Sequence, residues 1–454
     1  MKVLIVGAGE VGFHIASRLS IENKDVVVID HDQQSLRRVA DHTDVQTIAG
    51  SGSSPVVLKD AGIKEAEIIL AVTDSDETNL VACLVANILS PSTKKLARIR
   101  NADFDNYHNM FKDQPPYIDT IINPEIEVVN TIERLINVPG ASEVVDLAEG
   151  RLKLIGVRLA EDSPYARQKL SDLSERSGGR LFLVAAIVRS EKMIVPRGNT
   201  RLMANDIVYF ISEKETLGRS LKAFGKTAQP VKRALIVGGG RLGLRLAKRF
   251  EAADIKAKII DADPVRCAKL AEEVHKTVVL QGDGSDQELL AEEHIENMDV
   301  VVSLTNDEQT NILISLLAKR MGAANTVTKI SKFNYIPLMS TIGVEQVVSP
   351  RLSAINTILQ HIRKGKVLSA ISLKEEQAEI LEAVALSTSD LVGAPLKKIA
   401  LPKDTLVIGI IRGEEIIIPS GDSVIHPEDR VVIFAQKYAI PKVEKMLSVK
   451  LEFI

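Results

Sequence analysis

Short runs of aliphatic residues, rich in Val and Ile, recur along the N-terminal part of the chain. They alternate with longer stretches whose apolar residues have helical spacing. Unbroken apolar runs of this kind are typical of strands buried in a parallel sheet, and the helical stretches are typical of the crossovers between them. The pattern predicts strands at residues 3–6, 26–29, 45–48, 68–72, 96–99 and 117–122. This α/β alternation favours a doubly wound parallel sheet.

A further helix is predicted at residues 124–136, because Pro124 suits a first helical turn and apolar residues then follow at helical spacing. Ile126, Val129 and Ile132 lie on one face of this helix. Two interpretations remain open. Either the apolar face packs on the sheet that precedes it, or part of it is buried against a partner subunit.

A smaller α+β lobe is predicted next. Its strands are expected at residues 152–159, 182–188 and 208–211, and its helix at 169–176. Turn-forming residues at 189–192 predict a β-hairpin, and those at 412–415 predict another.

The whole pattern occurs twice. Residues 234–243, ALIVGGGRLG, restate residues 3–12, VLIVGAGEVG, and the first glycine of the run is displaced by 231 residues (238 − 7). Further matching segments are 50–53 with 282–285, 72–79 with 304–311, 123–124 with 349–350, 130–132 with 356–358, and 193–198 with 416–421. Ordered matches at a nearly constant displacement indicate a tandem duplication of a unit of roughly 225 residues.

A glycine-rich loop joins the first strand to the first helix. It consists of Gly7, Ala8, Gly9, Glu10, Val11 and Gly12. In such a loop the first glycine permits the tight turn, the second lets a pyrophosphate approach, and the third lets the helix pack close to the strand. The helix N-terminus adds amide N–H groups and a positive dipole end. Asp30, at the end of the second strand, is placed to accept hydrogen bonds from a ribose, so a Rossmann-like nucleotide site is predicted.

The second copy predicts a second site of the same kind. Its residues are Gly238, Gly240, Arg241, Leu242, Gly243 and Asp261. In each copy another acid, Asp32 or Asp263, follows two positions after the first. The paired negative charges disfavour the extra phosphate of NADP and leave NAD(H), ATP and ADP as candidates. Asp32 has a second interpretation as the N-cap of the helix that it begins.

Arg98 and Arg100 lie on one side of a strand at its carboxyl end, the edge where ligands bind in open α/β sheets. Two guanidinium groups there suit phosphate oxygens, although salt bridges at an exposed strand end are the alternative. The second copy has Lys329 and Ser331 at these positions, which is a weaker phosphate site.

Two threonines are also candidates for ligand contact. Thr73 and Thr305 follow the fourth strand of each copy, where a hydroxyl reaches ribose or phosphate. The acids Asp74, Asp76 and Glu77 either cap the helix that follows, bind a cation or face another subunit.

No catalytic set is visible in the sequence. The eight His residues form no metal-spaced pair, and there is no nucleophilic Ser motif or Cys–His arrangement. An NAD-dependent oxidoreductase would need an acid–base residue over the nicotinamide, and the small lobes are poor in His. A cation-binding switch has only the acids at 74–77 in its favour. We therefore expect a non-enzymatic ligand-binding protein without a metal site.

Composition and charge limit the classes of partner that the chain is expected to bind. The chain has 454 residues, a formal net charge of −3 and 45% hydrophobic residues, so nothing favours nucleic acid or direct lipid binding. No apolar run approaches the roughly 18 residues of a membrane-spanning helix, and any link to a membrane is expected to come through a protein partner. Cys83 and Cys267 lack nearby Cys or His and are expected to be buried thiols, which suits a reducing cytoplasm.

The arrangement resembles the TrkA family, the regulatory subunits of bacterial Trk potassium-uptake systems. The resemblance covers essentially the whole chain and rests on the two glycine loops with their acids, on residues 73–79 and 97–100, and on the counterparts of these segments. It implies two tandem RCK units, each a Rossmann-like KTN lobe followed by a TrkA-C lobe. The expected domains are 1–137 (nucleotide-binding), 138–225 (TrkA-C), 226–231 (linker), 232–366 (nucleotide-binding) and 367–454 (TrkA-C).

The resemblance further implies function and partners. It implies regulatory binding of NAD, NADH, ATP or ADP at the residues named above. It implies a peripheral protein at the cytoplasmic face of the inner membrane, a homo-oligomeric ring built from a dimer or tetramer of chains, and gating of a TrkH-type potassium-translocating subunit. The copies differ at Ser51, which is Asp283 in the second, and at the two arginines. We therefore hypothesise that the first site is the main triphosphate sensor.

Overall fold

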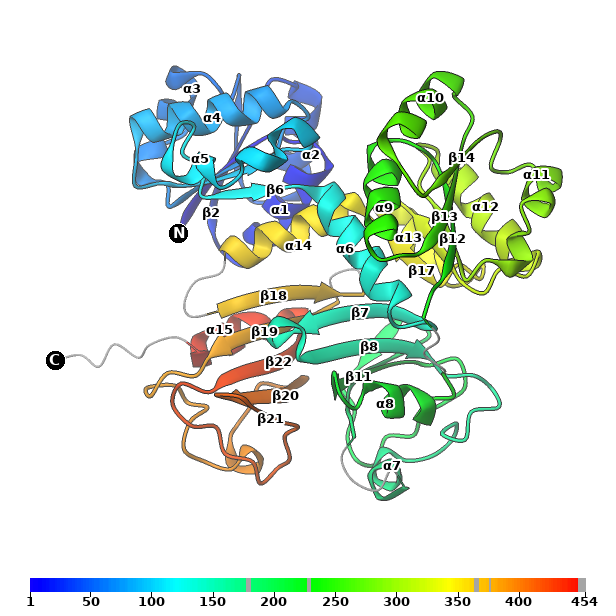
Figure 1. Ribbon diagram of the computed structural model, residues 1–454. Coiled ribbons are helices and arrows are strands. Elements are labelled where there is room, and N and C mark those ends of the chain that lie inside the picture. Colours follow the sequence, from blue (N-terminus) through cyan, green and yellow to red (C-terminus); the bar gives the residue numbers. More distant parts are fainter. Residues whose placement is uncertain (177–180, 227–229, 363–366, 375–376, 448–454) are drawn as a thin grey trace. The chain divides into compact units, whose positions relative to one another are not determined.

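The structure is a computed structural model that describes residues 1–176, 181–226, 230–362, 367–374 and 377–447 (Figure 1). The chain divides into two compact units. One comprises Met1–Glu127 with Pro350–Arg363, and the other comprises Val128–Ser349 with Lys364–Ile454. The predicted linker at 226–231 lies partly outside the described residues, at 227–229.

The first unit contains a parallel sheet of six strands in the order β3-β2-β1-β4-β5-β6. The strands are β1 Lys2–Val6, β2 Asp25–Asp30, β3 Gln46–Ala49, β4 Ile68–Ala71, β5 Lys94–Arg98 and β6 Thr120–Ile122. The helices are α1 Glu10–Ile21, α2 Gln33–His42, α3 Pro55–Asp60, α4 Asp76–Leu89 and α5 Met110–Asp113, with 3-10 turns at Ile63–Glu65 and Ala102–Tyr107. The strand order reverses between β1 and β4, and this switch point opens a crevice at the carboxyl ends of these strands.

The last strand of this sheet begins later than the sequence pattern predicts. The expected strand at 117–122 was wrong at its start, because Tyr117 has a left-handed backbone with φ of 57°. Such a residue cannot continue an extended strand. Only Thr120–Ile122 pairs with β5.

The second unit repeats this sheet in the order β14-β13-β12-β15-β16-β17. Its strands are β12 Arg233–Val237, β13 Lys256–Asp261, β14 Val278–Gln281, β15 Val300–Ser303, β16 Thr326–Lys329 and β17 Gln346–Val348. Its helices are α9 Arg241–Ala252, α10 Pro264–Glu273, α11 Gln287–Glu292, α12 Glu308–Arg320 and α13 Ile336–Met339, with 3-10 turns at Ile295–Asn297 and Phe333–Tyr335. The predicted doubly wound sheet is thus confirmed in both copies.

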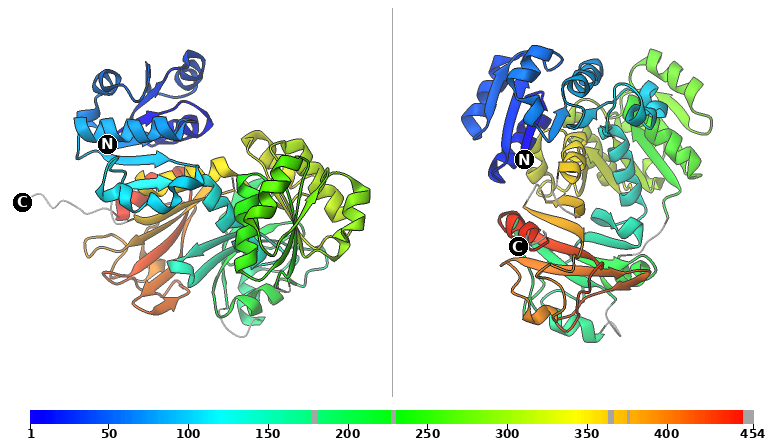
Figure 2. Two further views of the ribbon diagram at one scale, coloured as in Figure 1. Left: turned by 45° about the horizontal axis from the view of Figure 1, so that its top comes forward. Right: turned by 90° about the vertical axis from the view of Figure 1, so that its left-hand side faces the viewer.

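Two antiparallel sheets complete the second unit, with strand orders β10-β9-β11-β8-β7 and β18-β19-β22-β20-β21. The first has β7 Ala141–Leu147, β8 Leu152–Arg158, β9 Leu183–Arg189, β10 Lys192–Ile194 and β11 Ile207–Glu213, with α7 Leu170–Arg176, α8 Leu217–Ala223 and a 3-10 turn at Ala148–Gly150. The second, orange to red in Figures 1 and 2, has β18 Val367–Leu373, β19 Ala378–Val384, β20 Thr405–Arg412, β21 Glu415–Ile417 and β22 Arg430–Gln436, with α15 Ile440–Leu447 and 3-10 turns at Leu396–Lys398 and Lys437–Ala439.

These two sheets share one hydrophobic core, to which both contribute buried side chains such as Tyr209 and Phe434. Both predicted hairpins are confirmed. Ser190 and Glu191, with φ of 48° and 62°, form the turn from β9 to β10, and Gly413 lies in the turn from β20 to β21.

The helices that follow the two parallel sheets are exchanged between the units. α6, Pro124–Ile136, begins in the first unit, but Val129 and Ile132 lie in a hydrophobic core with Leu246 and Phe250 of α9. The interpretations made from sequence, packing on its own sheet or on a partner subunit, missed this third possibility within the chain. Conversely α14, Pro350–Ile362, yellow in Figures 1 and 2, packs against α1 in the first unit. Among the described residues, no helix is long and apolar enough to cross a membrane.

Candidate functional site

The glycine loop of the first unit has little tolerance for side chains on its inner side. Gly7 has φ of 113°, a conformation that favours glycine. A Cβ on Gly12 would lie 1.8 Å from the carbonyl oxygen of Gly7, so this glycine allows α1 to start against the strand end. A Cβ on Gly9 would meet nothing within 4 Å. Gly9 therefore faces open space, as a backbone that a ligand approaches should.

Asp30 connects the end of β2 to this loop. Its Oδ2 accepts a hydrogen bond from the Ala8 amide at 2.6 Å, and its Oδ1 accepts one from the Asp32 amide at 2.9 Å. Asp32 in turn accepts hydrogen bonds from the amides of Gln34 and Ser35, which confirms its interpretation as the cap of α2.

A cavity of about 820 Å³ opens at this edge of the sheet, within the size range of small-molecule and cofactor sites. The predicted residues that line it are Gly7, Gly9, Glu10, Val11, Asp30, Thr73 and Arg98. Residues that sequence reasoning did not assign to the site, among them Ser35, Arg38, Gly52 and Arg351, also line it. Arg100 is not among the lining residues, and Ala8 and Gly12 are buried behind the loop.

Opposite charges meet at the start of α1. A carboxylate oxygen of Glu10 lies 2.6 Å from Nη1 of Arg38, and its other oxygen lies 4.0 Å from Nη1 of Arg351. Burial opposes the ionisation of Glu10, but the hydrogen bond and charge of Arg38 outweigh it, and the pKa of Glu10 is lowered. Arg351 comes from α14, far away in the sequence, so no local motif could have revealed it.

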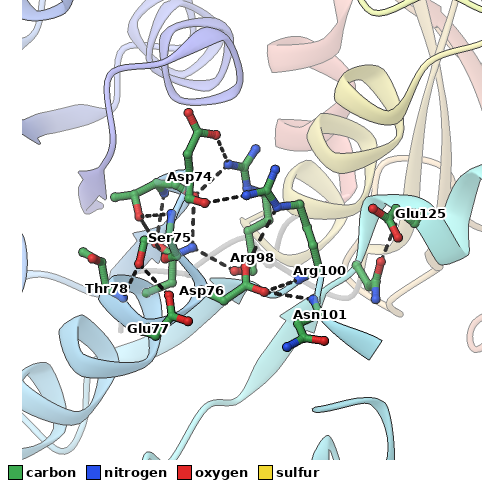
Figure 3. A network of polar contacts seen from close by, with 12 residues as sticks. Asp74, Ser75, Asp76, Glu77, Thr78, Arg98, Arg100, Asn101 and Glu125 are labelled. Carbon is green, nitrogen blue, oxygen red and sulfur yellow. Dashed lines mark hydrogen bonds and ion pairs between the residues drawn. The ribbon is translucent and has the colours of Figure 1, made fainter. Parts of the chain in front are cut away.

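The arginines predicted to bind phosphate form a network with the loop that follows β4 (Figure 3). Nη2 of Arg98 donates to the carbonyl oxygen of Thr73 at 2.7 Å and to Oδ1 of Asp74 at 2.6 Å. Arg100 donates to the carbonyl oxygen of Asp74. Burial lowers the pKa of the Arg98 guanidinium, and Asp74 partly offsets this effect. The loop and the arginines thus form one corner in which two guanidinium groups meet the carboxylates of Asp74 and Asp76.

Two residues of α4, Asp76 and Asn79, hold this corner in place. Oδ2 of Asp76 accepts the amides of Arg100 and Asn101 at 3.0 and 2.9 Å (Figure 3). Asn79, fully buried, accepts both the amide and the hydroxyl of Thr73 and donates to the carbonyl oxygens of Thr73 and Arg98. Sequence reasoning missed the role of Asn79, although its recurrence at the same spacing as Asn311 was a signal.

The second unit repeats the same backbone frame, by which we mean the glycine loop and the threonine–asparagine hydrogen bonds that hold the strand ends. Gly238 has φ of 108°, and a Cβ on Gly243 would lie 1.9 Å from the carbonyl oxygen of Gly238. A Cβ on Gly240 would meet nothing within 4 Å. Thr305 donates to Asn311 from both its amide and its hydroxyl, as Thr73 does to Asn79.

The side chains around this second frame differ from those of the first. Arg241 and Leu242 begin α9, at the positions of Glu10 and Val11. Lys329 replaces Arg98, and its Nζ lies 3.5 Å from the carbonyl oxygen of Leu304. Burial opposes the ionisation of Asp261, but hydrogen bonds from two backbone amides and from Arg266 outweigh it, and its pKa is lowered.

Both cysteines are buried free thiols, as predicted, and burial raises the pKa of the Cys83 thiol to about 12. Among the residues that the structure describes, no group of three or more acidic, His or Cys side chains is placed to hold a metal ion.

Comparison with protein families identifies both halves of the chain. The TrkA-N domain matches residues 3–124 and 234–350, and the TrkA-C domain matches residues 154–225 and 380–448. These matches follow the order predicted from the sequence repeat.

Relatives extend the likeness over the full length. The chain is 36% identical to the Trk system potassium uptake protein TrkA of Halomonas elongata, with 100% of both chains covered. It is 38% identical to the protein of the same name from Vibrio alginolyticus, over 96% of this chain and 95% of the relative. It is 35% identical to a TrkA homolog of Methanosarcina mazei over 98% of this chain and 99% of the relative.

Solved structures share the fold. The RCK domain of GsuK superposes with a TM-score of 0.59 at 16% identity, covering 98% of this chain and 94% of that one. The GsuK channel bound to NAD superposes with the same TM-score and identity, and the match covers 98% of this chain and 78% of the channel chain.

Proposed function

The chain belongs to the TrkA family of Trk potassium uptake proteins, and on that premise we propose that it is the nucleotide-sensing subunit of such a system. In this proposal it binds NAD(H), ATP or ADP and gates a TrkH-type potassium-translocating membrane subunit. Members of the family are uptake proteins, so the expectation of a non-enzymatic chain is confirmed. The oxidoreductase alternative is set aside on the same ground.

The observation that carries the proposal is the cavity at the glycine loop of the first unit. It joins three features that a nucleotide requires: open backbone at Gly9, an acid at Asp30 for ribose, and a guanidinium at Arg98 for phosphate. The helix N-terminus beside Gly9 adds unpaired amides that suit an anion. These groups recognise a nucleotide and offer no means of transforming it.

A regulatory ligand acts only through its difference in affinity between two conformations of the protein. A triphosphate that reaches Arg98 and Arg100 adds charge-assisted hydrogen bonds that a diphosphate lacks. It competes there with Asp74, whose side chain is 96% exposed and is easily displaced. Displacement of Asp74 loosens the link between Arg98 and the loop that begins α4. A triphosphate would therefore change the structure of this loop, and a diphosphate would not.

Family membership supports the proposed partner and assembly. We propose a peripheral location at the cytoplasmic face of the inner membrane and a homo-oligomeric ring of two or four chains that acts on the TrkH-type subunit. Because a ring couples several identical sites, modest differences in nucleotide affinity at each site add up over the assembly.

The decisive experiment is co-purification with a potassium-translocating membrane subunit, followed by potassium flux into vesicles with and without ATP. We expect the complex to form and its flux to change on addition of ATP. A complex whose flux is the same with ATP, ADP, NADH and no nucleotide would contradict the proposal.

A matched pair of variants links the flux to the first site. Gly9→Asp puts a carboxylate where phosphate binds, and Asp is a favoured N-cap residue, so the helix is retained. Gly240→Asp makes the same change in the second unit. The hypothesis that the first site is the main triphosphate sensor predicts that Gly9→Asp abolishes the ATP response and Gly240→Asp largely preserves it.

A further inference from the structure

The two acids that face the adenosine ribose in a Rossmann-like site have the same backbone partners in both units. Oδ2 of Asp30 accepts the Ala8 amide and Oδ1 accepts the Asp32 amide. Oδ2 of Asp261 accepts the Gly239 amide at 2.6 Å and Oδ1 accepts the Asp263 amide at 2.9 Å. The backbone amides therefore use one lone pair on each carboxylate oxygen and leave one on each oxygen for a ligand.

Their side-chain partners differ. Nη1 of Arg266 lies 2.9 Å from both carboxylate oxygens of Asp261, and its Nη2 lies 3.5 Å from Asp263. The residue displaced by 231 positions in the first unit is Ser35, whose hydroxyl bonds instead to Asp32 at 2.6 Å. Near Asp30, Nδ1 of the His31 imidazole lies 3.2 Å from Oδ1 of Asp30, and the His31 side chain is 92% exposed.

A carboxylate has about four lone-pair positions on its two oxygens. At Asp261 two are taken by backbone amides and the remaining two face the guanidinium of Arg266. A ribose diol would have to displace a charge-assisted ion pair before it could bond to this acid. At Asp30 no guanidinium takes the corresponding positions: Oδ1 has the exposed imidazole of His31 beside it, and Asp30 itself lines the cavity.

We infer that Arg266 occupies the ribose-hydroxyl position of the second nucleotide site and holds that site closed, so that each chain senses nucleotide through its first site alone. This inference rests on the proposed function for the nature of the ligand. The hydrogen bond that Arg266 donates to Asp261 also raises the pKa of Arg266, so the closing cation keeps its charge at any physiological pH.

The charge around the second site agrees with closure. Asp283 stands where the first site has Ser51, one of the residues that line the first cavity, and accepts the amide and hydroxyl of Ser285 at 2.8 Å. A phosphate in the second site would meet this extra carboxylate. Moreover, Lys329 offers a point charge in place of the planar guanidinium of Arg98.

The test is calorimetric titration of the full-length chain with NADH. The wild type is expected to bind about one NADH per chain, and Arg266→Ser, which restores the first-unit residue, about two. The reciprocal Ser35→Arg is expected to weaken NADH binding at the first site by about tenfold to a hundredfold, because hydrogen bonds to a charged group are lost. Arg266 is 45% exposed, so its replacement leaves the core intact.

Double variants separate this inference from the proposed function. In a Gly9→Asp background, NADH binding is expected to be absent with Arg266 and present with Arg266→Ser. If the wild type binds no nucleotide but Arg266→Ser does, the inference stands and the proposed sensing by the first site fails. Two equal NADH sites in the wild type, no gain in Arg266→Ser, or tight binding of NADPH to the second site through Arg266 would each overturn the inference.

Discussion

Asn79 and Asn311 make the same four hydrogen bonds in the two parallel-sheet domains, to a threonine and to the end of the neighbouring strand. Asp76 and Glu308 likewise each accept two successive amides after that strand. In contrast, the residues that would face a ligand differ in size and charge, as Ser35 and Arg266 do. The two halves thus share a frame, and their ligand chemistry is set separately from it.

Removal of the close contact between loop and strand has the largest expected effect, and it should be equal in both halves. Gly12→Ala and Gly243→Ala each force a Cβ against a backbone carbonyl. We expect each to lower the free energy of unfolding by about 3 kcal/mol, measured by urea unfolding with circular dichroism. Gly9→Ala, whose Cβ meets nothing within 4 Å, is the control. A marked loss in one half only would show that the frames are not equivalent.

Loss of the shared asparagine comes next. Asn79→Ala and Asn311→Ala each remove four hydrogen bonds, to a half-buried threonine and to the end of the neighbouring strand, at an expected cost of about 2–3 kcal/mol. Thermal unfolding of the two variants checks this prediction. Asn79→Asp serves as a comparison, because it keeps the acceptor while it loses the donor and adds a buried negative charge. Wild-type stability in both variants would contradict the stabilising role given to the two asparagines.

Arg100→Ala tests the difference between the two phosphate corners. We expect it to weaken ATP binding by about tenfold, the loss of one charge-assisted hydrogen bond to the terminal phosphate, and to affect NADH much less. Calorimetry with each ligand measures this split. The second unit has Ser331 at this position, so Ser331→Ala is the matched control. Equal losses for ATP and NADH would end the triphosphate-sensor hypothesis.

Arg351→Ala is expected to have a smaller effect on the same site. Its guanidinium lines the first cavity and is 38% exposed, so solvent screens its attraction for phosphate. We expect ATP affinity to fall a few-fold at low salt and hardly at all at high salt. The position matches Glu125 in the first half, and Arg351→Glu should give a larger loss. An ATP affinity independent of both changes at low salt would exclude Arg351 from the site.

The smallest expected effect is a pH dependence confined to the second half. The pKa of Asp261 is lowered in the folded state despite burial, through its amide and Arg266 bonds. This stabilisation is complete above the ordinary carboxyl pKa of about 3.9 and is lost as pH falls through the lower folded value. Arg266→Ser should therefore lose less stability on acidification than the wild type does, as followed by melting temperature. The Arg412–Asp429 pair, unchanged in both proteins, provides the background. Identical acid sensitivity would contradict the role given to Arg266.

Local sequence predicted the elements well where the constraint is local. Apolar runs, glycine spacing and turn residues fix backbone geometry within a few positions, so the strands of the first parallel sheet, both glycine loops and both hairpins could be predicted, whereas β7 was missed. Tyr117 was misassigned because a left-handed residue leaves no trace in hydrophobic periodicity. The predicted Asp30, Thr73 and Arg98 lie together at one cavity because parallel strands bring their carboxyl ends to one edge.

The sequence by itself determined the duplication, the doubly wound sheets and the family, since each is written in repeated local patterns. Only the tertiary structure decided which domain each connecting helix packs against, that Arg351 reaches the first cavity, and that Arg266 closes on Asp261. An apolar stripe on a helix must be buried, but the stripe does not specify the surface that buries it. An arginine several positions past an acid can either extend into solvent or form an ion pair with that acid. The helix packing and the place of Arg351 depend on contacts between distant segments, and the Arg266–Asp261 ion pair depends on the side-chain conformation that Arg266 adopts in the folded chain.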